Sequence, residues 1–105
     1  MLIYRLKKKS DFDKLFRKGK KGFSKSLTML YFPSDSFKIG YSVSKKHGNA
    51  VQRNRIKRLL RAAARNSFAD LKRNYRIVIM PRVAEEYSFD RFLSDMNYLK
   101  KKENL

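Results

Sequence analysis

Residues 49–65 alternate apolar and cationic positions with the period of an α-helix. At about 100° per residue, the apolar residues fall on one arc: Ile56, Leu59, Leu60 and Ala63. Cations spaced four residues apart fall on another arc: Arg53, Lys57, Arg61 and Arg65. Asn49 is a good N-cap residue, and Gly48 permits the tight turn before it. The pattern predicts an amphipathic helix that packs one arc on a core and presents the other as a cationic ladder.

The rest of the pattern predicts two further helices, a short helical turn and three strands. A first helix is expected over residues 10–16, with Ser10 as its cap and Gly19 as its stop. Strands are expected over residues 27–32, 38–44 and 75–80, and residues 20–25 are expected to form a basic connector. The segment 67–70 resembles a capping box, which predicts a short helix up to residue 72. Ser88 caps a last helix with an apolar stripe, namely Phe89, Phe92, Leu93, Met96 and Leu99.

These elements follow one another in the order α-β-β-α-β-α. The chain has 105 residues, of which 42% are hydrophobic, so one domain with a modest core is expected. We therefore predict an α+β fold, a two-layer α/β sandwich in which residues 1–105 form a single domain. The strand over residues 75–80 is apolar nearly throughout, which indicates an interior position in the sheet. Along residues 38–44, Ile39, Tyr41 and Val43 point one way and Gly40, Ser42 and Ser44 the other.

The charge of the chain points to a polyanionic partner. Lys and Arg number 27 against nine Asp and Glu, which gives a formal net charge of +18. Such an excess is typical of proteins that bind nucleic acid, and an anionic membrane is the competing target. Like charges four residues apart on a helix repel one another, so the cationic ladder favours a phosphate backbone over a merely solvated surface. Arginine also contacts phosphate through two N–H groups at once, which lysine cannot do.

No catalytic constellation is evident in the sequence. The chain has no Cys, and its single His, His47, follows two lysines, as in a loop or beside a phosphate. Asp11 and Asp13 suit a helix start, and Glu85 and Glu86 suit a solvated loop. The apolar opening Met1–Tyr4 is broken by Arg5, so no signal peptide is expected, and no apolar run approaches the length of a membrane span. The absence of Cys suits a reducing compartment, and we expect a cytoplasmic location.

Aromatic residues raise a second possibility for nucleic-acid binding, because aromatic rings beside cations can stack unpaired bases. Phe12, Phe16, Tyr31 and Tyr41 are the candidates. Ordinary core packing is the alternative for each ring. The face of the sheet on which each ring lies decides between the two.

Three successive segments form a continuous pattern, namely Ser42–Lys46, Gly48–Val51 and Arg53–Arg61, the last of which begins Arg-Asn-Arg. Together they resemble the bacterial ribonuclease P protein component family. The opening segment Leu6–Phe16 is similar to the first helix of that family. The similarity covers nearly the whole chain in size and element order. The loop over residues 33–37 is shorter than in some relatives.

The resemblance implies a function that spacing alone does not. The family's enzyme is a ribonucleoprotein that removes the 5′ leader from precursor tRNA by endonucleolytic cleavage. Its RNA subunit carries the active site and binds the catalytic Mg²⁺, so the protein itself is expected to supply no catalytic residue and no metal ligand. The small protein binds that RNA, contacts the single-stranded leader and improves substrate affinity and metal use. The resemblance also implies a left-handed β-α-β crossover, although the general rule favours the right-handed one.

Site residues follow from the resemblance and from the cationic ladder. Contacts to the RNA subunit are expected from Lys45, Lys46, Arg53, Asn54, Arg55, Lys57, Arg58, Arg61 and Arg65. A cleft for the leader is expected to be lined by Phe12, Phe16 and Tyr31. A different class of function, a non-catalytic ribosomal or RNA-assembly protein that uses the same basic helix, remains the alternative. The RNA recovered with the protein from cells would discriminate between the two.

Overall fold

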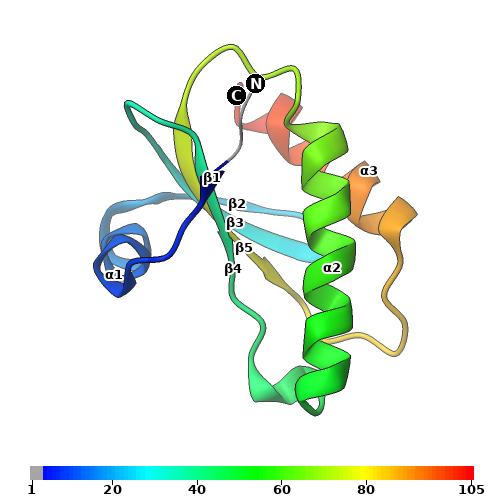
Figure 1. The fold of residues 1–105 in the computed structure, drawn as a ribbon. Helices are drawn as coiled ribbons and strands as arrows, with labels where there is room; N and C mark the ends of the chain where they lie inside the picture. The colour runs from blue at the N-terminus through cyan, green and yellow to red at the C-terminus, as the bar shows by residue number, and fades with distance from the viewer. Residues whose placement is uncertain (1–3) are drawn as a thin grey trace.

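A mixed sheet of five strands forms the centre of the computed structural model, which describes residues 4–105 (Figure 1). In spatial order the strands are β1 (Tyr4–Arg5), β4 (Lys38–Tyr41), β5 (Tyr75–Pro81), β3 (Leu27–Pro33) and β2 (Lys20–Phe23). The pairs β1–β4 and β4–β5 are parallel, whereas β3 is antiparallel to both β5 and β2. The central place of β5 confirms the interior strand that its apolar sequence predicts. Most of the apolar opening Met1–Tyr4 lies outside the described residues.

Helices cover both faces of this sheet. Helix α1 (Lys9–Lys18) lies on one face, and α2 (Ala50–Ser67) and α3 (Phe89–Lys102) lie on the other (Figure 1). Alternate residues of β5 divide the core accordingly, since Ile77 and Ile79 join the larger cluster under α2 and α3 while Val78 joins the smaller cluster under α1. The α+β class is confirmed. The two-layer prediction is incomplete, because α1 adds a layer over part of the second face.

Two of the observed strands were not predicted from the sequence. β2 occupies residues 20–23, which were expected to form a connector, and β1 adds a second edge strand. β2 is rich in lysine because it lies at a sheet edge, where charged side chains discourage pairing with another chain. The observed order is therefore β-α-β-β-β-α-β-α rather than α-β-β-α-β-α.

Three element boundaries also differ from the prediction. Helix α1 begins at Lys9 and has Lys8 at its N-cap without a side-chain cap bond, so Ser10 is not the cap, although the helix does end at Gly19. β4 ends at Tyr41 rather than at residue 44. The predicted helix over residues 67–72 is wrong, because Ser67 is the last residue of α2 and the fully buried Phe68 anchors the turn that follows.

The start of α2 is fixed as its sequence predicts. The Asn49 side chain accepts a hydrogen bond from the N–H of Gln52 at 2.9 Å, and the Gln52 side chain accepts one from the N–H of Asn49 at 2.8 Å. These bonds satisfy two N–H groups that a helix start otherwise leaves without partners. Gly48 has a φ of 114°, and an added Cβ there would lie 1.9 Å from Gln52 Oε1. The glycine is therefore required by the capped start of the helix.

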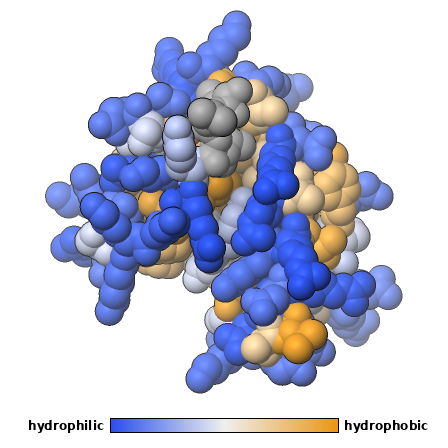
Figure 2. All heavy atoms as spheres, in the orientation of Figure 1, coloured by the Kyte–Doolittle hydropathy of each residue, from blue (hydrophilic) through white to orange (hydrophobic). Residues whose placement is uncertain are grey.

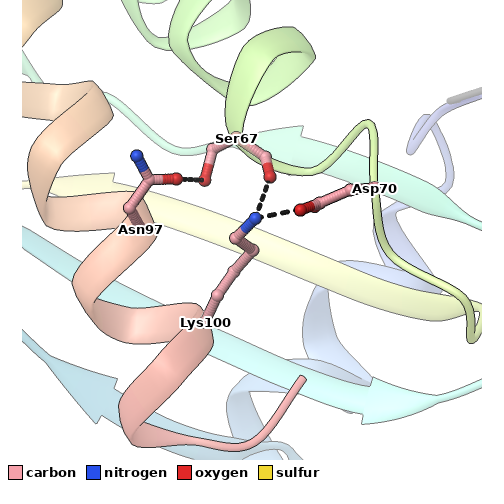
Figure 3. Close-up of polar contacts among 4 residues, drawn as sticks. All are labelled: Ser67, Asp70, Asn97 and Lys100. Atoms are coloured by element: carbon pink, nitrogen blue, oxygen red, sulfur yellow. Dashed lines mark hydrogen bonds and ion pairs between the residues drawn. The ribbon is translucent and has the colours of Figure 1, made fainter.

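The end of α2 is tied to α3 by Lys100, whose side chain is mostly buried (Figure 3). Its Nζ donates to the backbone carbonyl of Ser67, in the last turn of α2, and to Asp70 Oδ1 at 2.7 Å. Ser67 Oγ also hydrogen-bonds Asn97 Oδ1 on α3 at 2.7 Å. A carbonyl at a helix end lacks a partner within the helix. The Lys100 ammonium therefore caps α2 while joining it to α3.

Replacing Lys100 by methionine is expected to lower the free energy of unfolding by about 1–3 kcal/mol, because a partly buried carbonyl loses a charged donor. Urea denaturation at neutral pH measures the loss. Lys101→Met is the matched control, since Lys101 is exposed and makes no side-chain hydrogen bond within residues 4–105. Equal losses in the two variants would contradict the role given to Lys100.

The same contact makes stability depend on pH. The hydrogen bond and charge of Lys100 lower the pKa of the Asp70 carboxyl below its ordinary value. This contribution is present above the pKa of an unfolded aspartate, about 3.9, and is lost as the pH falls through the lower pKa of the folded state. The difference in stability between the wild type and Asp70→Asn is therefore expected to disappear in acid.

Candidate nucleic-acid interface

Helix α2 presents a dense cationic surface. Its 18 residues include six cations and no acid. Asn54, Arg55, Arg58 and Arg65 are exposed, while Arg53, Lys57 and Arg61 are half-buried at the margin of the core. Within residues 4–105, the ion pairs join Arg76 to Asp11 and Lys100 to Asp70, so no cation of α2 is paired with a carboxylate there. Figure 2 shows strongly hydrophilic side chains over much of this side of the molecule.

The cationic ladder borders a cleft of about 360 Å³ at the β1–β4 edge of the sheet, which we call the edge cleft. Lys57, Arg61 and Arg65 of α2 form one side, and Phe12 of α1 lies on the other. Gly40 and Tyr41 of β4 lie between them. The remaining lining residues are Tyr4, Arg5, Leu6, Ile39 and Ala64, so no carboxylate lines the cleft within the described chain. Cations and an aromatic ring, which sequence reasoning assigned to two RNAs, thus share one cleft.

Gly40 is the residue that lets Phe12 approach the sheet. A Cβ at this position would lie 2.6 Å from Phe12 Cζ and 2.9 Å from Phe12 Cε1. The alternation of β4 predicts that Gly40 and Tyr41 point to opposite faces of the sheet. The structure agrees, because Phe12, which covers Gly40, belongs to the core cluster under α1, whereas Tyr41 packs with the cluster under α2 and α3.

Tyr41 lines the edge cleft, whereas the sequence suggested it only as an aromatic ring that could stack on an unpaired base. Burial raises the pKa of its hydroxyl to about 12, although Arg61 and Arg65 lower it in part. The hydroxyl therefore keeps its proton at neutral pH and can donate a hydrogen bond. Its placement beside two guanidinium groups suits a negatively charged acceptor.

The other predicted RNA-contacting residues lie outside this cleft. Lys45 and Lys46 are exposed in the 3₁₀ turn η1 (Lys45–His47), directly before α2. Arg55 lies on the opposite flank of α2, in a groove of about 480 Å³ that it shares with His47, Tyr87, Glu85 and Glu86. The structure therefore does not bring Arg55 together with the ladder.

His47 has a structural partner in this second groove. Its Nδ1 lies 2.7 Å from Tyr87 Oη, and the two rings are 5.6 Å apart between centroids. Burial lowers the pKa of the imidazole, an effect that a hydrogen bond to the Pro81 backbone partly offsets. The contact between His47 and Tyr87 joins the loop after β5 to the turn before α2.

Of the three aromatic residues predicted for a leader cleft, the structure places only Phe12 in the edge cleft. Phe16 is exposed (44%) one turn further along α1 and is not a lining residue. Tyr31 is buried (6% exposed) on the other face of the sheet, where its hydroxyl donates to Glu103 Oε1 at 2.7 Å. Burial and the contact with Glu103 raise the pKa of Tyr31 to about 12. Tyr31 is therefore not a lining residue of the edge cleft.

The neighbouring Phe32 is an aromatic residue that the sequence reasoning missed. It packs in the core cluster under α1, and Lys14 Nζ lies 5.2 Å from the centre of its ring. Strand alternation would assign Tyr31 and Phe32 to opposite faces. The available signal was therefore the register of β3, which places Phe32 on the face that carries Phe12.

Within residues 4–105, no helix is both long and apolar enough to cross a membrane. No group of three or more His, Cys, Asp or Glu side chains in that range could hold a metal ion.

Comparisons with known proteins identify the family. The family model described as Ribonuclease P matches residues 3–104. The ribonuclease P protein component of Bacillus velezensis is 36% identical over 104 residues, which cover 96% of this chain and 90% of that protein. The component from Listeria monocytogenes serotype 4b is 52% identical over 61 residues, which cover 55% of this chain and 51% of that protein.

Solved structures agree with these sequence matches. The RNase P protein of Staphylococcus aureus superposes with a TM-score of 0.82 at 29% identity and covers 95% of this chain and 94% of that one. The RNase P protein of Thermotoga maritima gives a TM-score of 0.80 at 28% identity, with coverage of 92% and 96%. Sequence and fold therefore agree over nearly the whole chain, and the protein belongs to the bacterial ribonuclease P protein component family, whose members are subunits of the enzyme that processes precursor tRNA.

Proposed function

We propose that this subunit binds the ribonuclease P RNA through the basic surface of α2 and the single-stranded 5′ leader of precursor tRNA through the edge cleft. The observation that carries the proposal is the uncompensated cationic face of α2 beside a cleft that also holds an aromatic ring. The cations suit RNA phosphates, and an aromatic ring suits the stacking of an unpaired base.

The charge of the protein gives a physical reason why a catalytic RNA works with a protein subunit. An RNA subunit that carries the catalytic Mg²⁺ still repels an RNA substrate. A protein of formal charge +18 offsets part of that repulsion, so both substrate affinity and metal use improve. Because each neutralised phosphate releases counterions, binding is expected to weaken steeply as salt rises.

The proposed contacts to the RNA subunit lie on α2 and on the turn before it. The outward-facing members are Asn54 and Arg58, with Lys45 and Lys46 of η1 close in sequence. Arg53 and Arg55 extend the surface along the two flanks of the helix. Lys57, Arg61 and Arg65 complete the predicted set and also line the edge cleft.

The proposed leader site is centred on Phe12, with the exposed Phe16 one helical turn away. Single-stranded RNA offers both a base to stack and a phosphate to pair. In the edge cleft, the Phe12 ring can stack on the base and the α2 cations can pair with the phosphate. Tyr31 is not part of this proposal, because its hydroxyl is held by Glu103 beneath the other face of the sheet.

Two further expectations come from the family resemblance. The β4–α2–β5 connection is proposed to be a left-handed crossover, and the parallel pairing of β4 with β5 supplies the two strands that such a crossover joins. A crystal structure that traced a right-handed connection would contradict it. The protein is also proposed to act in the cytoplasm with its RNA, which cell fractionation would test.

Reconstitution with a bacterial ribonuclease P RNA tests the function. At low Mg²⁺ and near-physiological salt, adding the protein is expected to accelerate removal of the leader. The gain is expected to be larger for a precursor with a full leader than for one with a single-nucleotide leader. The proposal fails if the protein gives no acceleration, and its leader part fails if both precursors gain equally. RNA recovered with the protein from cells is expected to be ribonuclease P RNA rather than ribosomal RNA.

A further inference from the structure

The polar residues of α2 face two directions, into the edge cleft and outward from the molecule. Lys57, Arg61 and Arg65 line the cleft, whereas Asn54 and Arg58 lie on the exposed surface outside it. Arg65 follows Lys57 by about two helical turns, and at about 100° per residue the directions of their side chains around α2 differ by about 80°. One helix therefore presents cations both to its outer surface and to the cleft.

The cleft is built to receive an anion. Arg5, Lys57, Arg61 and Arg65 contribute four positive charges to its lining, and no lining residue in the described chain is acidic. Water in such a cleft screens these charges only in part, so a phosphate that enters would replace it favourably. Phe12 adds an apolar surface opposite these cations, which a simple anion would not use and a nucleotide would.

Tyr41 gives this cleft a specific hydrogen-bond donor. No side-chain hydrogen bond within residues 4–105 involves its hydroxyl, in contrast to the hydroxyls of Tyr31 and Tyr87, which bond Glu103 and His47. The Tyr41 ring is half-buried, and its hydroxyl keeps its proton at neutral pH. A donor of this kind beside Arg61 and Arg65 matches a non-bridging phosphate oxygen.

We propose that the edge cleft binds one phosphodiester of the leader strand, with the Tyr41 hydroxyl donating to a non-bridging oxygen and Arg61 and Arg65 pairing with its charge. The cationic ladder then serves two RNAs. Its outer residues Asn54 and Arg58 contact the RNA subunit, while Lys57, Arg61 and Arg65 contact the substrate. This inference rests on the proposed leader site and adds to it the chemical group that the site recognises.

The test uses the holoenzyme assembled with Tyr41→Phe, which removes only the hydroxyl. Binding of precursor tRNA with a full leader is expected to weaken about 10–100-fold, as for the loss of a hydrogen bond to a charged group. The affinity of the protein for the RNA subunit is expected to stay at its wild-type value. Tyr87→Phe is the matched control, because it removes a hydroxyl from the other flank of α2 and is expected to leave precursor binding unchanged.

A modified leader makes the test specific for the phosphodiester. Methylphosphonate linkages, which carry no charge, are placed one at a time along the leader. At one position the wild type is expected to lose affinity while Tyr41→Phe loses much less, because the contact is already absent. The inference is overturned if Tyr41→Phe binds the full-leader precursor as tightly as the wild type, if every linkage weakens both proteins equally, or if Tyr41→Phe weakens binding of the RNA subunit.

Phe12→Ala separates failure of this inference from failure of the leader site. If Phe12→Ala weakens binding of the full-leader precursor but Tyr41→Phe does not, the leader site stands and the phosphodiester contact is wrong. If neither variant affects the advantage of a full leader, the leader does not use the edge cleft and both proposals are wrong.

Discussion

Replacing Arg58 by glutamate is expected to weaken binding of the ribonuclease P RNA about 10–100-fold at physiological salt. Arg58 is exposed on the outer surface of α2, where the described chain offers it no carboxylate partner. A hydrogen bond to a charged group contributes about 1.5–3 kcal/mol, and about 1.4 kcal/mol corresponds to a tenfold change in affinity. The new carboxylate also repels phosphate. The dependence of log affinity on log salt is expected to fall by at least about 1, because one fewer phosphate is neutralised.

Arg73→Glu is the matched control for this experiment, since it makes the same change in net charge at an exposed position between α2 and β5. A general effect of net charge would weaken RNA binding equally in both variants. A specific contact through α2 would weaken it mainly in Arg58→Glu. Equal loss in the two variants, with thermal unfolding unchanged, would show that α2 is not the principal RNA contact.

The sequence could predict α2 in detail because the information that forms it is local. The apolar arc, the Asn49 N-cap and the glycine before it all lie within one continuous segment, and each favours the same helix. Local agreement of this kind is what makes a segment predictable. The same reasoning explains the success with β5 and with α3, whose Ser88 cap accepts from the N–H of Arg91 at 3.2 Å.

The edge strands could not be predicted in this way. β2 carries two lysines and a glycine, which are poor signals for a strand, and it forms because β3 offers a free edge. β1 is only two residues long and depends on pairing with β4. Strands whose stability comes mainly from pairing with a neighbouring strand, rather than from their own side chains, leave little pattern in the sequence.

The candidate site shows the same limit at the level of single side chains. The cationic ladder was visible because an i, i+4 spacing fixes the face of a helix. The choice between Tyr31 and Phe32 depends on the register of β3, and a shift of one residue moves a side chain to the opposite face. The edge cleft itself joins residues from β1, α1, β4 and α2, so it exists only once these elements have packed.

Replacing Gly40 by alanine is expected to disrupt the edge cleft while leaving the outer surface of α2 intact. The added Cβ would lie 2.6 Å from Phe12 Cζ and 3.2 Å from Leu6 Cβ, so the Phe12 ring must move away from the sheet. Overpacking of this kind costs about 1–3 kcal/mol of stability. Loss of a stacking ring is expected to cost about tenfold or more in affinity for the full-leader precursor, since stacking contributes about 1–3 kcal/mol per base. Urea denaturation and precursor binding to the holoenzyme measure the two effects.

Gly22→Ala is the control, because an added Cβ there meets the flexible side chains of Leu99 and Glu103 at 3.2 and 3.1 Å, on the opposite face of the sheet. It is expected to leave precursor binding unchanged. A double-mutant cycle identifies the cause more directly: in a Phe12→Ala background, Gly40→Ala is expected to cost little further stability or affinity, because the clashing ring is gone. If the two losses simply add, Gly40 does not act through Phe12, and the geometry proposed for the leader site is wrong.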